Sequence, residues 1–142
     1  MDADSVRAMV QFHLDQSAVD ADLAHEIYHA DAVLEFPQSG ERFEGVENFR
    51  EWRKAYPADV ELRIERVRGA DQVWTVEVQI RYDGGPWKFG VAIYELRGEK
   101  VAAETIYYGE PWEPPEWRAR WRAAPPATSG QQPSPATSGT GP

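Results

Sequence analysis

The 142-residue chain contains no cysteine. Disulfide bonds, a thiolate nucleophile and cysteine-ligated zinc are therefore excluded. Long apolar runs are missing as well, and the N-terminal segment "MDADSVRAMVQF" is acidic. We expect neither a signal peptide nor a membrane-spanning helix there, and a cytoplasmic location is the expectation.

Basic side chains are also scarce, because 15 Lys and Arg stand against 24 Asp and Glu, a net charge of −9. A chain this acidic repels phosphate backbones and anionic membranes, which argues against nucleic-acid and membrane partners. The one basic cluster is "WRARWR" at 117–122. Trp117 and Trp121 are one helical turn apart, so we expect them to pack against the domain while Arg118 and Arg122 stay solvated.

Large hydrophobic side chains are plentiful up to residue 123. The chain is 42% hydrophobic and has six Trp, six Tyr and five Phe, enough for the core of one domain. Residues 124–142, "APPATSGQQPSPATSGTGP", contain no aromatic or large aliphatic side chain. The sequence therefore predicts one folded domain over residues 1–123 and a disordered tail over 124–142.

Apolar periodicity predicts three helices. The first covers 5–16, the second about 20–29, and the third opens at Gly45 and ends at Pro57. On the first helix the apolar spacing includes His13 along with aliphatic residues, namely Val6, Met9, Val10 and Leu14. On the third helix one stripe comprises Val46, Phe49, Trp52, Arg53 and Tyr56.

A short strand, "AVLEF" at 32–36, follows the second helix and leads into a turn, "QSGE". Four longer strands then cover 59–68, 72–83, 87–97 and 100–108, joined at "DGG" and "RGEK" by hairpin turns. The strand over 72–83 alternates apolar and polar residues, which gives it one buried face. Helices followed by antiparallel strands indicate an α+β fold with the helices packed on one face of a curved sheet.

The segment from 28 to 52 carries a more specific pattern. It contains "YHADAVLEFP", then a turn, F-x-G at 43–45 and "NFREW". Together with the element order over about residues 5–112, it resembles the nuclear transport factor 2-like superfamily, in particular its SnoaL-like and ketosteroid-isomerase-like branches. The resemblance implies a cone-shaped α+β fold whose helices and curved antiparallel sheet enclose a pocket for a small apolar molecule. It implies no cofactor, and it leaves a homodimer open.

The resemblance also places the residues that catalyse steroid isomerisation in that family. The aspartate base corresponds to Phe36, the helix tyrosine to Phe12, and the strand acid to Ala92 or a neighbour. None of these side chains can transfer a proton. The resemblance therefore implies the pocket without its known chemistry, and we expect the following residues to line it: Phe12, Phe36, Trp52, Val78, Ile80, Ala92 and Tyr108.

Two glutamates are candidates for acid–base chemistry. Glu35 alternates with Phe36, so it points away from the pocket as a surface carboxylate. Glu104, in "AAETIYY", shares a strand face with Ile106 and Tyr108, and a carboxylate on that apolar wall would have its pKa raised by desolvation. Two interpretations of Glu104 remain open: an acid–base catalyst, or a partner of an arginine across the sheet such as Arg63 or Arg81.

The motif "HEIYH", His25 to His29, matches the zinc-protease pattern H-E-x-x-H. On a helix over 20–29, however, both histidines would lie opposite the apolar arc and face solvent. A third ligand is also poorly placed, because the glycine of the extended motif is replaced by Ala32. We therefore expect no metal site, and a zinc hydrolase is only a remote alternative.

The implied pocket leads to two hypotheses about function. The leading hypothesis is a SnoaL-like pocket protein that acts, without a cofactor, as an isomerase, cyclase or dehydratase on a small apolar or aromatic compound. A non-catalytic module that binds a ligand or dimerises is the alternative. Glu104 is the candidate catalytic residue in the first hypothesis and has no such role in the second.

Overall fold

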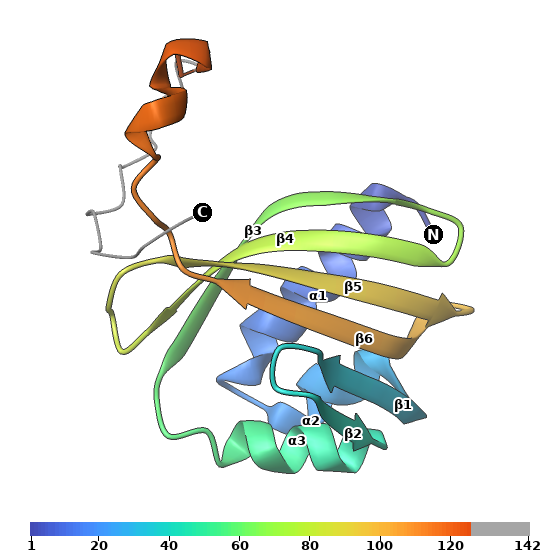
Figure 1. Cartoon of the computed structure of the whole chain (residues 1–142). Helices are drawn as coiled ribbons and strands as arrows, with labels where there is room; N and C mark the ends of the chain where they lie inside the picture. Colours follow the sequence, from blue (N-terminus) through green and yellow to red (C-terminus); the bar gives the residue numbers. More distant parts are fainter. Residues whose placement is uncertain (126–142) are drawn as a thin grey trace.

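A computed structural model describes residues 1–125 of the chain (Figure 1). Of the tail predicted over 124–142, residues 126–142 lie outside the described residues. The elements, in chain order, are α1 (Ala3–Ser17), α2 (Ala21–Ala24), η1 (His25–Ile27), β1 (Tyr28–Phe36), β2 (Glu41–Glu44), α3 (Val46–Lys54), β3 (Val60–Ala70), β4 (Val73–Tyr82), β5 (Lys88–Arg97), β6 (Lys100–Gly109) and η2 (Glu116–Trp121).

Helix α1 begins where the sequence provides a cap. The Asp2 side chain accepts a hydrogen bond from the Ser5 backbone N–H at 2.8 Å, which satisfies one of the free donors of the first turn. The buried residues of α1 are Val6, Val10 and His13, spaced i, i+4, i+7. The predicted helix is confirmed, with its amphipathic face as the periodicity indicated.

The predicted second helix is shorter than expected. α2 has four residues, a single 3₁₀ turn follows, and β1 already begins at Tyr28. The segment "YHADAVLEF" is rich in residues that suit a strand, and Tyr28 pairs with Val101 of β6. As a result His25 and His29 belong to different elements and do not share a helix face.

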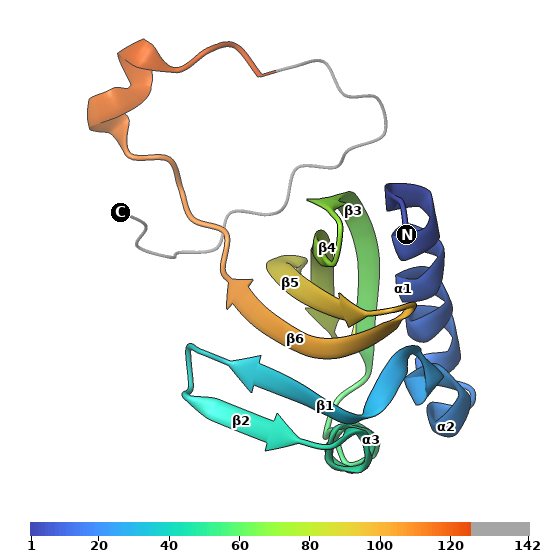
Figure 2. The same ribbon diagram turned by 90° about the vertical axis from the view of Figure 1, so that its right-hand side faces the viewer.

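Six strands form one curved, open sheet in the order β2-β1-β6-β5-β4-β3. Neighbouring strands are antiparallel except β1 and β6, which run parallel, so the sheet is mixed rather than purely antiparallel. Helix α1 lies against β3, and α3 lies against β1. Figure 2 shows the sheet curving around the space that these helices cover.

The inner face of the sheet follows the predicted alternation. On β4, the inward residues Trp74, Val76, Val78 and Ile80 are all buried. Their outward neighbour Gln79 is also buried, and the Arg63 guanidinium donates hydrogen bonds to its side-chain oxygen. The α+β cone predicted from the sequence is confirmed.

The C-terminal segment departs from its prediction. After Gly109 the chain leaves the sheet, and η2 stands away from the domain (Figures 1 and 2). Trp117 is 72% exposed and Trp121 is 66% exposed, so the expectation that they pack against the domain is wrong. Pro111, Pro114 and Pro115 explain this, because a proline-rich stretch favours an extended chain over a turn back toward the sheet.

No helix within residues 1–125 is both long and apolar enough to cross a membrane.

Candidate functional site

Glu104 lies on the inner face of the sheet, opposite Tyr94 of β5 and beside Leu34 of β1. Only 3% of its surface is exposed. The Tyr28 hydroxyl donates a hydrogen bond to Oε1, and Arg53 Nη2 lies 3.9 Å from Oε2. Burial raises the pKa of Glu104, although Arg53 and hydrogen bonds from Tyr28 and Tyr94 act in the opposite direction. The carboxyl group can therefore keep a proton at a pH where an exposed glutamate has lost it.

Two tyrosine hydroxyls flank this carboxyl group. Tyr28 is the first residue of β1, and Tyr94 lies directly across from Glu104. Burial raises the pKa of both phenols. Each hydroxyl therefore stays protonated and available as a donor toward a negative charge.

Arg53 connects α3 to the same group. Its Nη1 donates to the Tyr28 hydroxyl at 3.1 Å and lies 3.1 Å from Nε2 of His25. Burial alone would lower the pKa of Arg53, but Tyr28 and Glu104 raise it, so the guanidinium remains charged. A permanent positive charge thus stands beside the Glu104 carboxyl group.

The histidines His13 and His25 complete the buried network. Nδ1 of His13 donates to the Ala24 carbonyl at 2.7 Å, and Nδ1 of His25 donates to the Ala21 carbonyl at 2.6 Å, since a carbonyl oxygen only accepts. Nε2 of His25 is then free to accept from Arg53. Burial lowers the pKa of His13 to about 3 and also lowers the pKa of His25. Both rings are neutral near pH 7, so the positive charge that faces Glu104 is that of Arg53.

An aromatic cluster lies next to this polar network. Phe36, Phe43, Trp52 and Tyr108 form it, with ring centroids 5.7 Å apart for Phe36 and Trp52 and 6.1 Å apart for Phe36 and Tyr108. Phe36 ends β1, and Tyr108 is the penultimate residue of β6, so the cluster marks one end of the sheet. The indole N–H of Trp52 is buried and has no hydrogen-bond partner among residues 1–125. An acceptor on a bound molecule would satisfy it.

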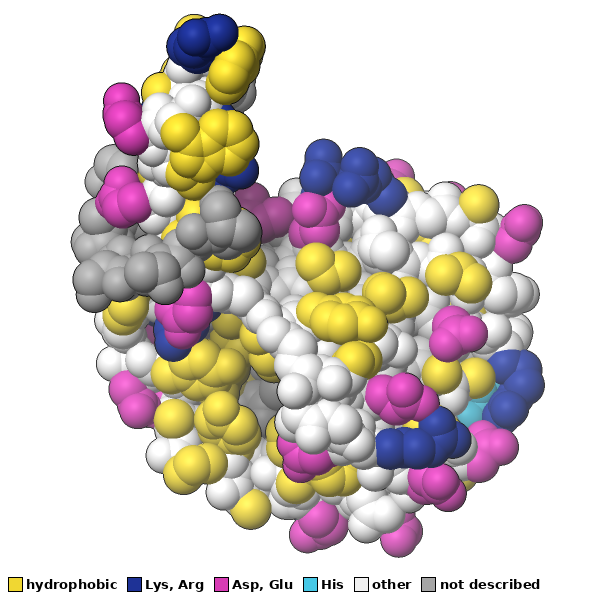
Figure 3. Space-filling view, in the orientation of Figure 1, with side chains coloured by type: hydrophobic (Ala, Val, Ile, Leu, Met, Phe, Trp, Pro, Cys, Tyr) yellow, Lys and Arg dark blue, Asp and Glu magenta, His cyan; other side chains and the backbone are white. Residues whose placement is uncertain are grey.

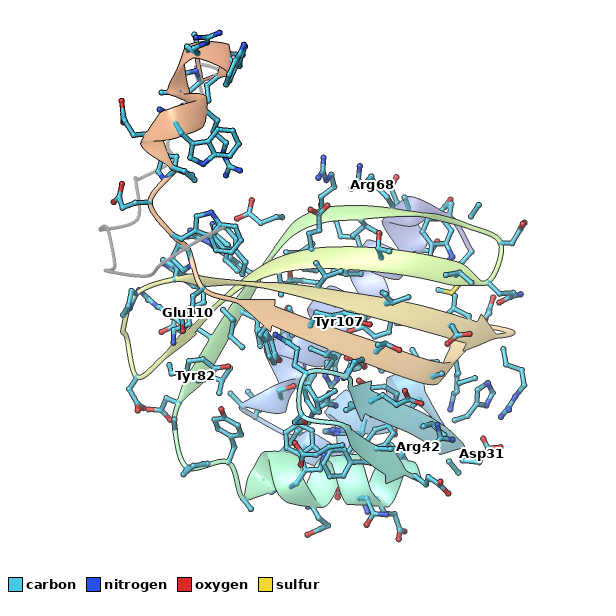
Figure 4. All side chains as sticks on the ribbon, viewed as in Figure 1. Asp31, Arg42, Arg68, Tyr82, Tyr107 and Glu110 are labelled. Carbon is cyan, nitrogen blue, oxygen red and sulfur yellow. The ribbon has the colours of Figure 1, made fainter. Side chains whose placement is uncertain are left out.

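The same end of the sheet is open to the surface. Figure 3 shows the surface hollowed between the β1–β2 turn and the segment that joins α3 to β3, with hydrophobic side chains at its edge. Tyr82, labelled in Figure 4, lies at that edge and stacks on Tyr56 with ring centroids 6.0 Å apart. Burial raises the pKa of Tyr108 to about 12. The approach to the cluster is therefore aromatic, with neutral phenol groups.

The structure brings most of the predicted pocket residues to this region. Phe36 contacts both Trp52 and Tyr108, and the remaining strand residues, Val78, Ile80 and Ala92, are buried on the inner sheet face. Phe12 does not join them, because 38% of its surface is exposed. At 100° per residue, Phe12 points away from the buried stripe, and the neighbouring His13 faces the interior.

The two glutamates are placed as follows. Glu35 lies on the outer face and forms an ion pair with Arg42 at 2.5 Å, as expected of a surface carboxylate. Glu104 pairs with neither of the arginines named as alternatives. Arg63 contacts Gln79, and Arg81 pairs with Glu61, both away from the interior. The cation beside Glu104 is Arg53 instead.

The H-E-x-x-H residues do not converge. His25 is 4% exposed, so the expectation that it faces solvent is wrong. His29 lies on β1, and its Nε2 contacts the Arg97 carbonyl at 2.6 Å. Within residues 1–125, no three His, Cys, Asp or Glu side chains lie close enough to hold a metal ion.

Sequence reasoning missed the partners of Glu104, namely Tyr28, Arg53 and Tyr94, and it also missed His25, which contacts Arg53. Arg53 carried a signal, since a charged residue appeared within an otherwise apolar helix stripe. Tyr94 carried a weaker one, because alternation places it on the inner face of β5. Tyr28 and His25 were hidden by the helix predicted over 20–29.

Comparison with known proteins agrees with this architecture. The SnoaL-like domain model matches residues 6–104. This chain belongs to the SnoaL-like family. The family lies within the nuclear transport factor 2-like superfamily, as the chain's fold indicates.

Solved structures share this fold. An NTF-2-like protein of unknown function from Burkholderia xenovorans LB400 is 34% identical, with 87% of this chain and 97% of that chain covered and a TM-score of 0.77. A Kribbella flavida DSM 17836 structure, named provisionally as a ketosteroid isomerase, is 24% identical over 89% and 93% of the two chains, with a TM-score of 0.75. An LEH-like epoxide hydrolase from M. tuberculosis is 15% identical over 75% and 84%, with a TM-score of 0.63. No curated protein shows significant similarity to this SnoaL-like chain.

Proposed function

We propose that the space between the helices and the sheet binds a small, mostly apolar compound and that Glu104 exchanges a proton with it. The reaction class is isomerisation, cyclisation or dehydration without a cofactor. The observation that carries this proposal is a buried carboxyl group with a raised pKa on the inner sheet face, flanked by Tyr28, Tyr94 and Arg53.

These groups suit proton transfer at carbon beside a carbonyl. Glu104 would take the proton, while a developing enolate would be stabilised by the Arg53 charge and by tyrosine hydroxyls. In a site that excludes water such donors are effective because they need no reorganisation. The family's isomerase residues correspond here to Phe36, Phe12 and Ala92, so Glu104 would supply acid–base chemistry from a different position on the wall.

The aromatic cluster supports the ligand class. Phe36, Trp52 and Tyr108 offer flat apolar surfaces at the open end, and the Trp52 N–H is a donor without a partner among residues 1–125. A planar ring with one polar oxygen would match both features. Neighbouring folds named for ketosteroid isomerase, polyketide cyclase and epoxide hydrolase activities also support a small organic ligand.

A specific observation favours one alternative, a binding protein without turnover. Both Glu104 oxygens already face partners, Tyr28 on one side and Arg53 on the other. A carboxyl group held in this way can be a structural polar network rather than a reagent. The two functions differ in whether a bound compound exchanges protons.

The test measures that exchange directly. A panel of small cyclic ketones is incubated with the protein in D₂O, and deuterium uptake beside the carbonyl is followed by NMR. We expect accelerated uptake for at least one ketone and a loss of about 100-fold or more in Glu104→Gln, since general acid–base catalysis contributes about 10²–10⁴-fold. Glu35→Gln, a surface control, should be unchanged.

Binding is measured in parallel with 2-naphthol, a planar ring with one hydroxyl, by quenching of tryptophan fluorescence. Saturation at about one naphthol per chain, without deuterium uptake by any ketone, would support the alternative function, a binding protein without turnover. If no ketone takes up deuterium and 2-naphthol does not bind, both functions are contradicted.

A further inference from the structure

The Arg53 guanidinium keeps unused hydrogen-bond donors on the side that faces Glu104. Its Nη1 has two partners, Nε2 of His25 and the Tyr28 hydroxyl, each at 3.1 Å. Nη2 forms no hydrogen bond with any residue among 1–125, and Oε2 of Glu104 lies 3.9 Å from it, beyond hydrogen-bond range. The Arg53 side chain is 21% exposed, so another molecule can reach it. Both N–H groups of Nη2 are therefore available to an acceptor on a ligand.

The charge of this region depends on the protonation of Glu104. Arg53, on α3, stays charged. The other titratable groups on the elements packed around the carboxyl group are neutral near pH 7, because burial lowers the pKa of the histidines and raises the pKa of the phenols. They are His13 on α1, His25 on η1, Tyr28 on β1, Tyr94 on β5 and Tyr108 on β6. The region is thus neutral when Glu104 is ionised and carries one positive charge when Glu104 is protonated.

An anion and a proton on Glu104 favour each other in such a region. When Glu104 is protonated, the Arg53 charge lacks a counter-charge, and a buried charge is unfavourable unless it is paired. An anionic ligand at Nη2 would supply that counter-charge. When Glu104 is ionised, the same ligand would stand beside a like charge and be repelled. Binding of an anion therefore raises the pKa of Glu104 further and draws a proton from solvent.

The surroundings of Arg53 select an anion that carries a flat ring. The guanidinium carbon lies 5.3 Å from the centroid of the Trp52 ring and 5.6 Å from that of Tyr28. Trp52 belongs to the aromatic cluster at the open end of the sheet, where Phe36 lies 5.7 Å from it. A planar ring packed on this cluster would hold a substituent next to the guanidinium. A carboxylate suits that position, because it accepts hydrogen bonds from guanidinium N–H groups.

We propose that the ligand of this site is a planar organic acid, that it binds as its anion to Nη2 of Arg53, and that its binding is coupled to the uptake of one proton by Glu104. The inference rests on the proposed function, because it places the ligand in the same interior and names its chemical class. The proton comes from solvent, so that Arg53, the anion and the protonated Glu104 together are neutral. In such a complex Glu104 begins the proton exchange as the donor.

The test compares two ligands of the same shape and different charge, 2-naphthoate and 2-naphthamide, by titration calorimetry of the full chain between about pH 5.5 and 8.5. We expect the dissociation constant of naphthoate to rise with pH, by up to about tenfold per pH unit once Glu104 ionises in the free protein. That of naphthamide should stay constant. Titrations in two buffers with different enthalpies of protonation measure the proton uptake. It should approach about one proton per bound naphthoate and be absent for naphthamide.

Three variants assign the effect to its residues. In Glu104→Gln the affinity for naphthoate should become independent of pH and, at the upper end of the range, exceed that of the wild type at least about tenfold. Arg53→Met should weaken naphthoate at least about tenfold more than naphthamide. Lys54→Met removes the neighbouring charge from the exposed side of α3 and should leave both affinities unchanged. A far-UV spectrum checks the folding of each variant, and Glu104→Gln tests the coupling without relying on Arg53→Met.

The proposal is overturned if wild-type affinity for naphthoate does not change with pH, if the change persists in Glu104→Gln, or if Arg53→Met weakens both compounds equally. Binding of naphthamide without binding of naphthoate would also overturn it, while the proposed function would stand. If neither compound binds, this proposal fails, and the ketone exchange experiment decides the proposed function separately.

Discussion

The substitution Glu104→Gln makes the strongest prediction about stability. Glutamine keeps the shape of the side chain and can still accept the hydrogen bond from Tyr28, but it cannot ionise. Comparing the free energy of unfolding of the wild type and the variant therefore isolates the contribution of the proton on Glu104. Burial raises the pKa of this carboxyl group above its ordinary value of 4.5, which we take for the unfolded chain.

The sign of the effect follows from proton counting. Between pH 4.5 and the higher pKa of the folded protein, the folded state holds a proton that the unfolded state has released. Raising the pH in this window therefore lowers the free energy of unfolding of the wild type by about 1.4 kcal/mol per pH unit. Below the window both states are protonated, and above it both are ionised, so the dependence ends there. The glutamine variant lacks this dependence.

The assay is urea unfolding, followed by tryptophan fluorescence, at half-unit steps from pH 4.5 to 8.5. The difference in free energy of unfolding, wild type minus Glu104→Gln, should fall as the pH rises through the window. The substitution also removes the partner of Arg53, which adds a constant amount to the difference in free energy of unfolding. The slope of that difference against pH is therefore the quantity that tests the raised pKa. Glu35→Gln, on the exposed face, should show no such slope. A difference that does not change with pH would refute the raised pKa and the reasoning built on it.

Three further predictions concern this interior and the β3–β4 hairpin. Arg53→Met should extend the pH dependence of stability to higher pH, because Arg53 lowers the pKa of Glu104; the pH series above measures it. Phe36→Asp should cost about 3 kcal/mol in urea unfolding, since it removes aromatic packing and places a charge in an apolar cluster. Gly69→Ala should cost about 2–3 kcal/mol, because a Cβ there would collide with the backbone of β4.

Each of the last two substitutions has a matched control. Phe12→Asp places the same charge on the exposed side of α1 and should cost about 1 kcal/mol or less. Gly109→Ala should be nearly neutral, since no atom lies within 4 Å of the position that a Cβ would take there. Equal costs for Phe36→Asp and Phe12→Asp would contradict the different positions assigned to the two rings. A stable Gly69→Ala would show that β3 and β4 are less closely packed at that point.

Periodicity predicted those parts of the fold in which one face of an element is buried. The alternation in β4 and the apolar stripe of α1 each have a single physical cause, burial against a neighbouring layer, and both were confirmed. His13 belongs to the α1 stripe, whereas the role transferred from the family fell on Phe12. One residue along a helix changes direction by 100°, so an approximate alignment cannot identify a functional side chain.

The polar network could not be predicted because long-range contacts create it. Tyr28, Arg53 and Glu104 come from β1, α3 and β6, and no local pattern indicates that they meet. A short 3₁₀ turn also replaced the expected helical turn at His25, which moved that ring from the surface to the interior. Trp117 and Trp121 show a further limit, since helical spacing indicates a shared face but not what covers it.

The central claim is that a ligand enters the interior and reaches Glu104, the group that exchanges a proton with it. The most direct measurement is the carboxyl ¹³C resonance of Glu104, assigned by its absence in Glu104→Gln, recorded across pH with and without 2-naphthol. We predict that this resonance titrates at higher pH than the resonances of exposed glutamates and that naphthol shifts it. A resonance that titrates with the exposed glutamates and ignores naphthol would contradict the claim.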